Sequence, residues 1–409
     1  MWTQGLDRLL SHLVRHGELS VTYPDGTTRV YGSGTPRAAV TLHAANLPRR
    51  LVLTPHMAMG EAYMDGELTI EDDGLRSFID LITRNAAQNG LPGFHKPVAA
   101  LRRLGRRLAQ FNPAARAQRN VAHHYDLSGE LYDLFLDDDR QYSCAYFARP
   151  DMTLDEAQEA KKQHIARKLR IEPGMRVLDI GCGWGGMGLT LARDFGAHVT
   201  GVTLSREQHA MANARAAEAG LTDRAQFHLM DYRDITGPFD RIVSVGMFEH
   251  VGVPHYHEYF SKVHDLLSPD GIALIHTIGR TTPPGATSPW ITKYIFPGGY
   301  CPALSETVAA IEPTGLGATD IEVWRLHYAE TLKEWHARFV ANEKKARALY
   351  DERFCRMWRF YLLASEFTFR NAGQVVFQLQ LTKAQDAVPL TRDYLYPAPS
   401  PEKRPLAAE

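Results

Sequence analysis

The sequence has 409 residues, of which 44% are hydrophobic, and its 46 Lys and Arg against 47 Asp and Glu give a formal net charge of −1. This length and composition predict a soluble globular protein of two or three domains and exclude an intrinsically disordered chain. Because the net charge is close to zero, no global field draws the whole protein to nucleic acid or to a membrane, and any such attraction must be local.

The first hundred residues lack the regular alternation of strands and helices that follows later, and the composition changes near residue 105. Residues 19–23 and 28–31 alternate around Pro24-Asp25-Gly26, which is typical of a β-hairpin. Residues 73–86 have the apolar spacing of a helix. These patterns predict a smaller α+β domain over residues 1–105.

A basic segment follows this domain. Between Leu81 and Tyr125 there is no acidic residue, whereas eight basic residues occur there. They are Arg84, Lys96, Arg102, Arg103, Arg106, Arg107, Arg116 and Arg119. Leucines interleaved with these basic residues favour an amphipathic helix at 98–108 that lies on an anionic membrane surface. Each basic side chain near such a surface contributes about 1 kcal/mol to binding. A solvated linker helix is the alternative, and residues 106–120 are assigned as a basic linker.

The remaining chain has the pattern of a doubly wound α/β domain over residues 121–395, followed by a flexible tail at 396–409. Thr153 and Glu156 form a capping box that opens a helix reaching about Arg170. Helical segments then alternate with five predicted strands, at 176–180, 198–203, 225–229, 241–245 and 272–277. The carboxyl ends of such strands form the ligand crevice, so we expect functional residues to gather there.

Residues 177–186 read Val-Leu-Asp-Ile-Gly-Cys-Gly-Trp-Gly-Gly, an apolar strand that breaks into glycines directly before a helix. Gly181 and Gly183 supply turn geometry and let the backbone approach a ligand closely. The loop lacks the Lys-Ser/Thr of a phosphate-binding loop, and no acidic residue ends the next strand, which disfavours NAD. Asp179 suits a cofactor with a positively charged amino-acid end, which points to S-adenosylmethionine. A merely structural tight turn is the alternative.

Four cysteines lie far apart without Cys-x-x-Cys spacing, which favours reduced thiols over a zinc site or a disulfide framework. They are Cys144, Cys182, Cys301 and Cys355. His250, His255 and His257 are close in sequence, but we interpret them as ordinary polar residues and assign no metal. No apolar run approaches the roughly eighteen residues of a membrane span, and the first residues do not resemble a signal peptide, so a cytoplasmic protein is expected.

Further segments between residues 120 and 377 add to the glycine loop. They include His124-Tyr125-Asp126-Leu127-Ser128, Tyr142-Ser143-Cys144-Ala145-Tyr146-Phe147, Val202-Thr203-Leu204-Ser205 with Gln208, Ser244-Val245-Gly246-Met247-Phe248-Glu249-His250-Val251-Gly252 and Leu326-x-Tyr328-x-x-Thr331-Leu332. In this order they resemble the cyclopropane-fatty-acyl-phospholipid synthases and the mycolic acid cyclopropane synthases, which use S-adenosylmethionine. Several such segments are far more specific than the loop alone. The resemblance implies a Rossmann-like class I methyltransferase domain.

The resemblance and the glycine loop together imply a set of cofactor-binding residues. They are Tyr142, Ser143, Asp179, Gly181, Cys182, Gly183, Thr203, Gln208, Asp231 and Tyr232. Thr203 and Gln208 are expected to hydrogen-bond the cofactor where other nucleoside sites use a carboxylate. Ser143 and Asp231 have an alternative role as caps.

The implied reaction transfers the sulfonium methyl group to a cis double bond of an acyl chain, which then carries positive charge. The site must align alkene and methyl, exclude water and stabilise the cation with aromatic faces, for which Tyr125 is the first candidate. Ring closure needs a base, and the resemblance suggests bound bicarbonate, held by Glu249, His276 and Tyr328, with Cys144 at the same pocket. Taken singly, each of these residues has an ordinary structural explanation, such as a helix cap or a core side chain.

Three other functions are weighed against this interpretation. A methyltransferase of the same family that methylates the acyl substrate without closing a ring is barely separable by sequence. A nucleic-acid methyltransferase is disfavoured because residues 246–249 contain no Pro-Pro-aromatic element, and no nucleic-acid partner is expected. A non-catalytic lipid-binding protein rests only on the N-terminal region and the basic linker. We expect unsaturated phospholipid acyl chains as substrate, peripheral association with the inner membrane surface, and a homodimer.

Overall fold

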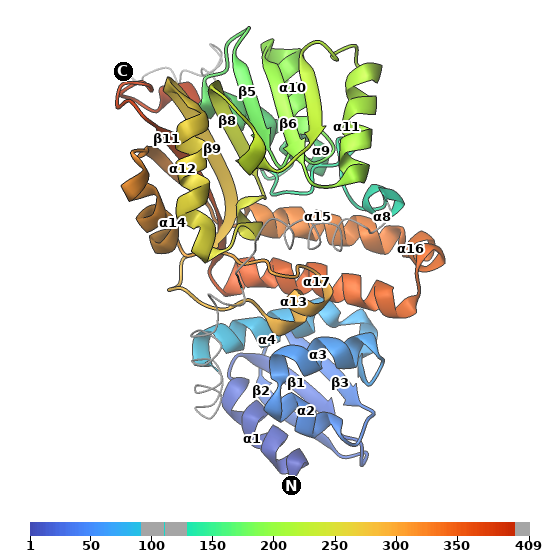
Figure 1. Cartoon of the computed structure of the whole chain (residues 1–409). Coiled ribbons are helices and arrows are strands. Elements are labelled where there is room, and N and C mark those ends of the chain that lie inside the picture. The colour runs from blue at the N-terminus through green and yellow to red at the C-terminus, as the bar shows by residue number, and fades with distance from the viewer. Residues whose placement is uncertain (91–109, 111–128, 397–409) are drawn as a thin grey trace, which may run out of the picture.

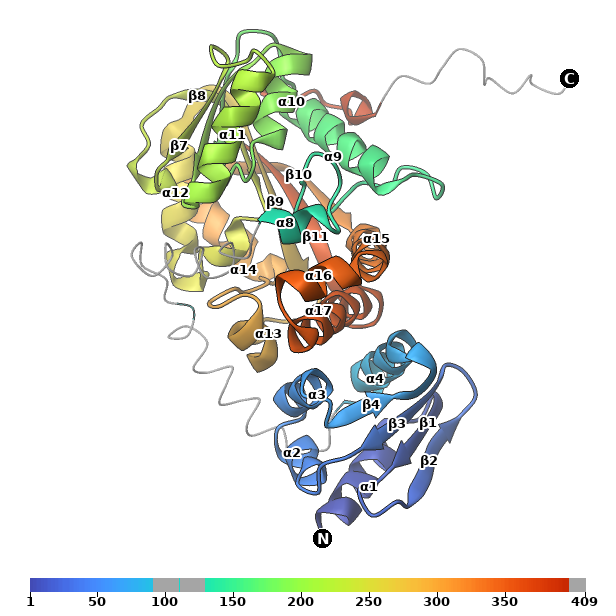
Figure 2. The same ribbon diagram turned by 90° about the vertical axis from the view of Figure 1, so that its right-hand side faces the viewer.

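The computed structural model describes residues 1–90, 110 and 129–396, which form two β-sheets with their helices (Figures 1 and 2). The predicted helix at 98–108, the basic linker except Gln110, Tyr125 and all but the first residue of the tail lie outside the described residues. Residues 1–90 are called the N-terminal unit below, and residues 129–396 the large unit. In these two units, no helix has the length and apolar character that crossing a membrane requires.

The N-terminal unit contains a four-stranded sheet in the order β2-β1-β3-β4. Its strands are β1 Gly17–Thr22, β2 Thr28–Ser33, β3 Arg37–Leu42 and β4 Leu68–Ile70. The predicted hairpin is confirmed, because β1 and β2 pair antiparallel, whereas β1 and β3 pair in parallel. Its helices are α1 Trp2–Leu13, α2 Leu47–Leu53, α3 Pro55–Met64 and α4 Leu75–Asn89, with a short 3₁₀-helix, η1 Glu71–Asp73.

The large unit contains a seven-stranded sheet in the order β10-β11-β9-β8-β5-β6-β7. Its strands are β5 Arg176–Ile180, β6 His198–Thr203, β7 Ala225–Leu229, β8 Phe239–Val245, β9 Leu267–Arg280, β10 Gly317–Trp324 and β11 Gln374–Thr382. The strands from β7 to β9 run parallel, and β11 is antiparallel to both of its neighbours. This arrangement confirms the predicted class I methyltransferase fold.

Two apolar cores cover the two faces of this sheet. One core joins the sheet to α9 Leu154–Leu169, α10 Gly186–Phe195 and α11 Arg206–Glu218. The other joins it to α12 Tyr256–Leu266 and α14 Leu304–Ile311. The capping box predicted at the start of α9 is present, since Thr153 and Glu156 each bond the other's backbone N–H. The remaining short helices are α8 Gly129–Asp133, η3 Tyr232–Asp234, η4 Phe248–His250, η5 Val253–His255, η6 Glu312–Thr314 and η7 Asp393–Leu395.

A layer of helices lies between the two sheets (Figures 1 and 2). It consists of α13 Pro289–Tyr294, α15 His327–Ala341, α16 Glu343–Leu349 and α17 Glu352–Asn371. α17 packs against α15 on one side and against α4 and α3 on the other. Buried side chains of the N-terminal unit, such as Leu9 and Phe78, therefore belong to the same apolar cluster as Trp358 and Phe360 of α17.

Polar contacts hold the N-terminal unit against this layer. Arg76 of α4 donates two hydrogen bonds to the fully buried carboxylate of Glu366 on α17, at 2.8 and 2.9 Å. Glu61 of α3 accepts hydrogen bonds from Lys293 and Tyr294 on α13, at 2.7 and 2.9 Å. Because a buried carboxylate needs hydrogen-bonded partners, these contacts define one relative placement of the two units.

The Arg76–Glu366 contact generates a stability prediction. Arg76→Ala is expected to lower the free energy of unfolding by about 2 kcal/mol, because it removes two hydrogen bonds to a buried charge. The matched control is Arg84→Ala on the same helix, because its partner Asp80 is 18% exposed whereas Glu366 is fully buried. This control is expected to cost less than about 0.5 kcal/mol. Chemical denaturation measures both. Equal effects would contradict the role given to Glu366.

Candidate functional site

A small cavity of about 120 Å³ lies at the carboxyl ends of β5, β6, β7 and β8. β5 lies at the point where the strand order reverses, since its neighbours are β6 and β8. Open α/β sheets bind ligands at this place. The cavity is lined by six of the predicted cofactor residues, which are Gly181, Gly183, Thr203, Gln208, Asp231 and Tyr232.

The glycine loop shapes one wall of the small cavity. Gly181 has a φ of 80° and Gly183 a φ of 54°, conformations that favour glycine. A Cβ atom on Gly181 would lie 2.9 Å from the Cβ of Met247. A side chain at position 181 is thus excluded both by the backbone conformation and by a close neighbour.

The polar residues of the small cavity are held by one another. Thr203 donates a hydrogen bond to the side-chain oxygen of Gln208 at 2.9 Å, and Ser205 caps the helix that carries Gln208. Asp231 accepts two side-chain hydrogen bonds from Arg233, at 2.6 and 2.9 Å. Burial opposes ionisation of Asp231, but the bonds from Arg233 keep its pKa below the ordinary value. Burial raises the pKa of the neighbouring Tyr232, so its hydroxyl stays protonated.

Asp179 and Cys182 are buried beside this cavity without lining it. Asp179 Oδ2 has no hydrogen-bond partner within the described part of the chain. Burial raises the pKa of Asp179 to about 7, although the charge of Lys161 acts in the opposite direction. An unsatisfied buried carboxylate oxygen fits a site that accepts a donor group from a ligand. Burial likewise raises the pKa of the Cys182 thiol.

A large cavity of about 640 Å³ adjoins the small one. Six residues predicted from the sequence line it together, namely Tyr142, Ser143, Cys144, Glu249, His276 and Tyr328. The predicted cofactor residues therefore lie at both cavities, because Tyr142 and Ser143 line the large cavity and six others line the small one. Tyr125, predicted as a cation-stabilising residue, lies outside the described residues.

Glu249 follows β8 in the short helix η4 and is 8% exposed. Its Oε1 accepts a hydrogen bond from the backbone N–H of Ile278 at 2.6 Å. Its Oε2 has no partner in the parts of the chain that the structure describes. Burial raises the pKa of Glu249 to about 7, so the carboxyl group changes between its neutral and charged forms near neutral pH.

His276 lies on β9 and is held from the neighbouring strand. The side-chain nitrogen of Gln378 on β11 lies 3.0 Å from His276 Nδ1. Burial keeps the pKa of His276 well below its ordinary value, so the imidazole is neutral. With Gln378 donating to Nδ1, the single ring proton lies on Nε2, which makes that atom a donor.

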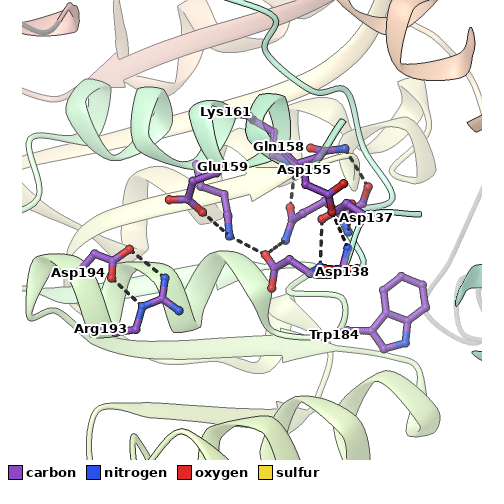
Figure 3. A network of polar contacts seen from close by, with 12 residues as sticks. Asp137, Asp138, Asp155, Gln158, Glu159, Lys161, Trp184, Arg193 and Asp194 are labelled. Atoms are coloured by element: carbon purple, nitrogen blue, oxygen red, sulfur yellow. Dashed lines mark hydrogen bonds and ion pairs between the residues drawn. The ribbon is translucent and has the colours of Figure 1, made fainter. Parts of the chain in front are cut away.

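The Tyr142-Ser143-Cys144 segment is fixed by two side chains of α9. Lys161 donates hydrogen bonds to Gln141 Oε1 and to Ser143 Oγ, both at 2.7 Å, and is fully buried. Gln158 donates to the backbone oxygen of Ser143 at 3.0 Å. Figure 3 shows Gln158 and Lys161 on this helix, within a wider polar network. Burial lowers the pKa of Lys161 to about 8.

Aromatic rings form a wall of the large cavity. Tyr142 stacks on Trp335 of α15 at a centroid distance of 5.2 Å, and its hydroxyl lies 3.0 Å from that of Tyr361. Tyr328 meets Trp335 edge-on at 5.7 Å and Phe369 at 4.9 Å. Aromatic faces of this kind attract a positive charge.

Gly246 and His250 line both cavities and so mark the place where they meet, called the junction below. His250, which the sequence predicts to be an ordinary polar residue, lies between the two cavities. Burial lowers the pKa of His250 to about 4, so it is neutral at the junction. A ligand in the small cavity and a ligand in the large cavity can contact each other here.

Lys161, Gln378 and His250 were missed from the sequence. One feature of the sequence could have indicated such residues, namely polar side chains within apolar, buried elements. Gln378 and Gln380 interrupt the apolar strand β11 in this way. No group of three or more His, Cys, Asp or Glu side chains within the described ranges has a metal-binding arrangement. His255 instead lies 2.9 Å from Glu258, and the four cysteines are free.

The sequence model of the mycolic acid cyclopropane synthetase family matches residues 113–379. The chain belongs to this family. Its members are S-adenosylmethionine-dependent transferases, and this chain is one of them. A second model, of a domain of unknown function, matches residues 6–89.

Individual relatives agree with this family. The cyclopropane-fatty-acyl-phospholipid synthase of Escherichia coli (strain K12) is 40% identical over 352 residues, which cover 84% of this chain and 89% of that protein. A cyclopropane synthase structure from Mycobacterium tuberculosis aligns with a TM-score of 0.62 and 34% identity, over 66% of this chain and 99% of that one. A mycolic acid cyclopropane synthase bound to SAH and CTAB aligns with a TM-score of 0.62 and 35% identity, over the same shares.

The buried Lys161 generates a binding prediction. Lys161→Met is expected to weaken binding of S-adenosylhomocysteine about tenfold, because it leaves Ser143 and Gln141 without a donor and releases the segment that carries Tyr142. Titration calorimetry measures the dissociation constant. The control is Lys162→Met, since Lys162 bonds Asp139 and Glu159 rather than this segment. Equal dissociation constants for the two variants would contradict the positioning role of Lys161.

Proposed function

We propose that this protein is a cyclopropane-fatty-acyl-phospholipid synthase, which converts cis double bonds in phospholipid acyl chains into cyclopropane rings. The observation that carries the proposal is the junction, where the small cavity at the strand ends adjoins a large, mainly apolar cavity. The large cavity also contains Cys144, Glu249, His276 and Tyr328. The similarity to the Escherichia coli enzyme supports the same substrate class.

The residues of the small cavity fit S-adenosylmethionine. Bound there, the cofactor supplies an electrophilic methyl group on a positively charged sulfonium. Asp179 is buried beside the cavity rather than in its lining, and its unsatisfied carboxylate oxygen would accept a hydrogen bond from the amino-acid end. Thr203, Gln208 and Asp231 offer hydroxyl, amide and carboxylate groups for the nucleoside. Tyr142 and Ser143 would complete the site from the large cavity, and the glycine loop allows close approach of the backbone.

The large cavity would bind the acyl chain and keep it dry. Carbon–carbon double bonds are weak nucleophiles, so the chain must be held against the methyl group in a near-attack position. Tyr142 and Tyr328, which both pack against Trp335, would face the positive charge that develops on the acyl chain. Tyr125, outside the described residues, stays a candidate for the same role. Exclusion of water protects this charge from capture.

Ring closure requires removal of one proton from the transferred carbon, and we assign this step to a bicarbonate ion. Neutral His276 would donate from Nε2 and Tyr328 from its hydroxyl to bicarbonate oxygens, with Cys144 completing the same pocket. The free Oε2 of Glu249 would accept the bicarbonate hydroxyl proton and so raise the basicity of the ion. Only the ionised form of Glu249 can do this.

The domain limits and the membrane contact belong to the same proposal. We assign residues 1–105 to an N-terminal domain, 106–120 to a linker, 121–395 to the catalytic domain and 396–409 to a tail. The substrate is part of a bilayer, so the enzyme would act as a cytoplasmic protein peripherally bound to the inner membrane surface. The basic residues between 81 and 125 would meet anionic lipids, and a homodimer would supply two such contacts.

The raised pKa of Glu249 generates a pH prediction. Burial raises this pKa to about 7, and the ionised form is the active one, so kcat is expected to increase about tenfold from pH 6 to pH 8. The measurement uses saturating lipid and S-adenosylmethionine and a constant bicarbonate concentration. Saturation removes the effect of Asp179, whose pKa is also raised to about 7 but which acts on cofactor binding.

Glu249→Gln tests the assignment, because the amide cannot take the proton. Its kcat is expected to fall by a factor of about 10²–10⁴ and to lose the rise with pH, while S-adenosylhomocysteine binds with unchanged affinity. A variant that keeps the wild-type pH profile would show that another group is responsible.

The proposed function is tested by product analysis. The purified protein is incubated with vesicles of cis-unsaturated phospholipid, S-adenosylmethionine and bicarbonate, and the released fatty acids are examined by mass spectrometry and proton NMR. The expected product has gained one CH₂ and shows upfield ring protons. The same mass with an alkene and a methyl branch would instead identify an acyl-chain methyltransferase, and an unchanged lipid that stays bound would identify a lipid-binding protein.

A further inference from the structure

The large cavity does not end at the catalytic groups but continues into the N-terminal unit. There it is lined by a stripe of α1, at Leu6, Leu9, Leu10 and Leu13. It is also lined by Leu19 and Val21 of β1 and by Val40 and Leu42 of β3. Alternate residues of a strand share one face, and the α1 positions share one side of a helix. The cavity therefore occupies the core between α1 and the four-stranded sheet.

Helical stripes connect this core to the junction. On α4 the cavity is lined by Phe78, Ile79, Ile82, Thr83 and Ala86. On α17 it is lined by Tyr361, Ala364, Ser365, Thr368 and Phe369. Both sets recur at intervals of three and four residues, so each belongs to one side of its helix. α4 and α17 pack against each other (Figures 1 and 2). Because both helices contribute lining residues, the cavity passes along their contact.

The polarity of the lining changes along the cavity. One end of the cavity lies between α1 and the four-stranded sheet. Among the described residues, those that α1 and this sheet contribute to the lining are all leucine or valine. At the other end the lining includes Ser143, Glu249, His276 and Arg280. A charged or polar head group would lose its hydration without replacement at the leucine–valine end, whereas a hydrocarbon tail would not.

We infer that the N-terminal unit binds the methyl end of the acyl chain whose double bond reacts at the junction. The inference rests on the proposed function, and it gives a role to the segment that the model of a domain of unknown function matches. An acyl chain threaded from the catalytic groups past α4 and α17 ends against Leu6, Leu9 and Leu13. The length of this inner section then limits how many carbons follow the double bond, so the N-terminal unit selects its position in the lipid.

Photolabelling of the complete protein tests this placement without any substitution. Two phospholipids are compared in vesicles, in the presence of S-adenosylhomocysteine. One carries a diazirine on the terminal carbon of a cis-unsaturated chain, and the other carries it near the ester. After irradiation, digestion and mass spectrometry, the terminal probe is expected to label peptides of α1 and α4, and the ester-proximal probe is expected not to label α1. Terminal labelling confined to the large unit would overturn the inference.

The two proposals fail in distinguishable ways. Labelling of α1 without any cyclopropane product in the vesicle assay would support the acyl-binding site and remove the proposed activity. Product formation with no label in α1 or α4 would support the activity and overturn the acyl-binding site.

A substitution in the core gives a second readout. Leu9→Trp is expected to reduce terminal-probe labelling at least fivefold. It is also expected to reduce kcat/KM for lipids with nine carbons after the double bond. The factor of this reduction is expected to be at least ten times the factor for lipids with five carbons there. The control is Val30→Trp, on the exposed side of β2 and 60% exposed, which is expected to change neither. An equal loss of kcat/KM for both lengths in Leu9→Trp would overturn the selecting role.

Discussion

The proposed reaction requires that water be excluded from the junction, and the other features of this protein depend on this constraint. Burial raises the pKa values of Asp179 and Glu249 and lowers the pKa values of His250 and His276. In each case the shift favours the neutral form of the side chain. Neutral groups can line an apolar cavity at little cost, whereas unpaired charges cannot. The same dryness strengthens the attraction between aromatic rings and a developing cation. A carbocation on the acyl group can therefore exist long enough to lose its proton to a base.

The helical layer between the two sheets maintains this environment. α15 supplies Tyr328 to the aromatic wall and Trp335 behind it, and α17 supplies Tyr361, whose hydroxyl meets that of Tyr142. α17 also packs against α4, where Arg76 holds the buried Glu366. The contact between the units thus surrounds the part of the cavity that continues into the N-terminal unit. Substitutions that loosen this contact are expected to admit water as well as to lower stability.

Much of the catalytic fold follows from local patterns in the sequence. The strand–helix alternation, the glycine loop and the Thr153 capping box predict the parallel part of the sheet and its ligand crevice, and each is present. β10 and β11 were not predicted because β11 pairs antiparallel with β9 and with β10, and both of these partners are distant from it in sequence. His250, Lys161 and Gln378 escaped for a similar reason: their roles come from neighbours that tertiary packing supplies. The continuation of the cavity into the N-terminal unit has no local signal, since its leucines have the spacing of an ordinary core.

The central claim is that methyl donor and acyl group meet at Gly246 and His250. A crystal structure of the protein with S-adenosylhomocysteine and a cis-unsaturated phospholipid tests this most directly. The cofactor sulfur is expected in the small cavity, with the double bond beside it at the junction and within reach of one transferred carbon. The ester group is expected toward the polar end of the large cavity. A double bond bound away from the junction, with the cofactor in place, would contradict the account.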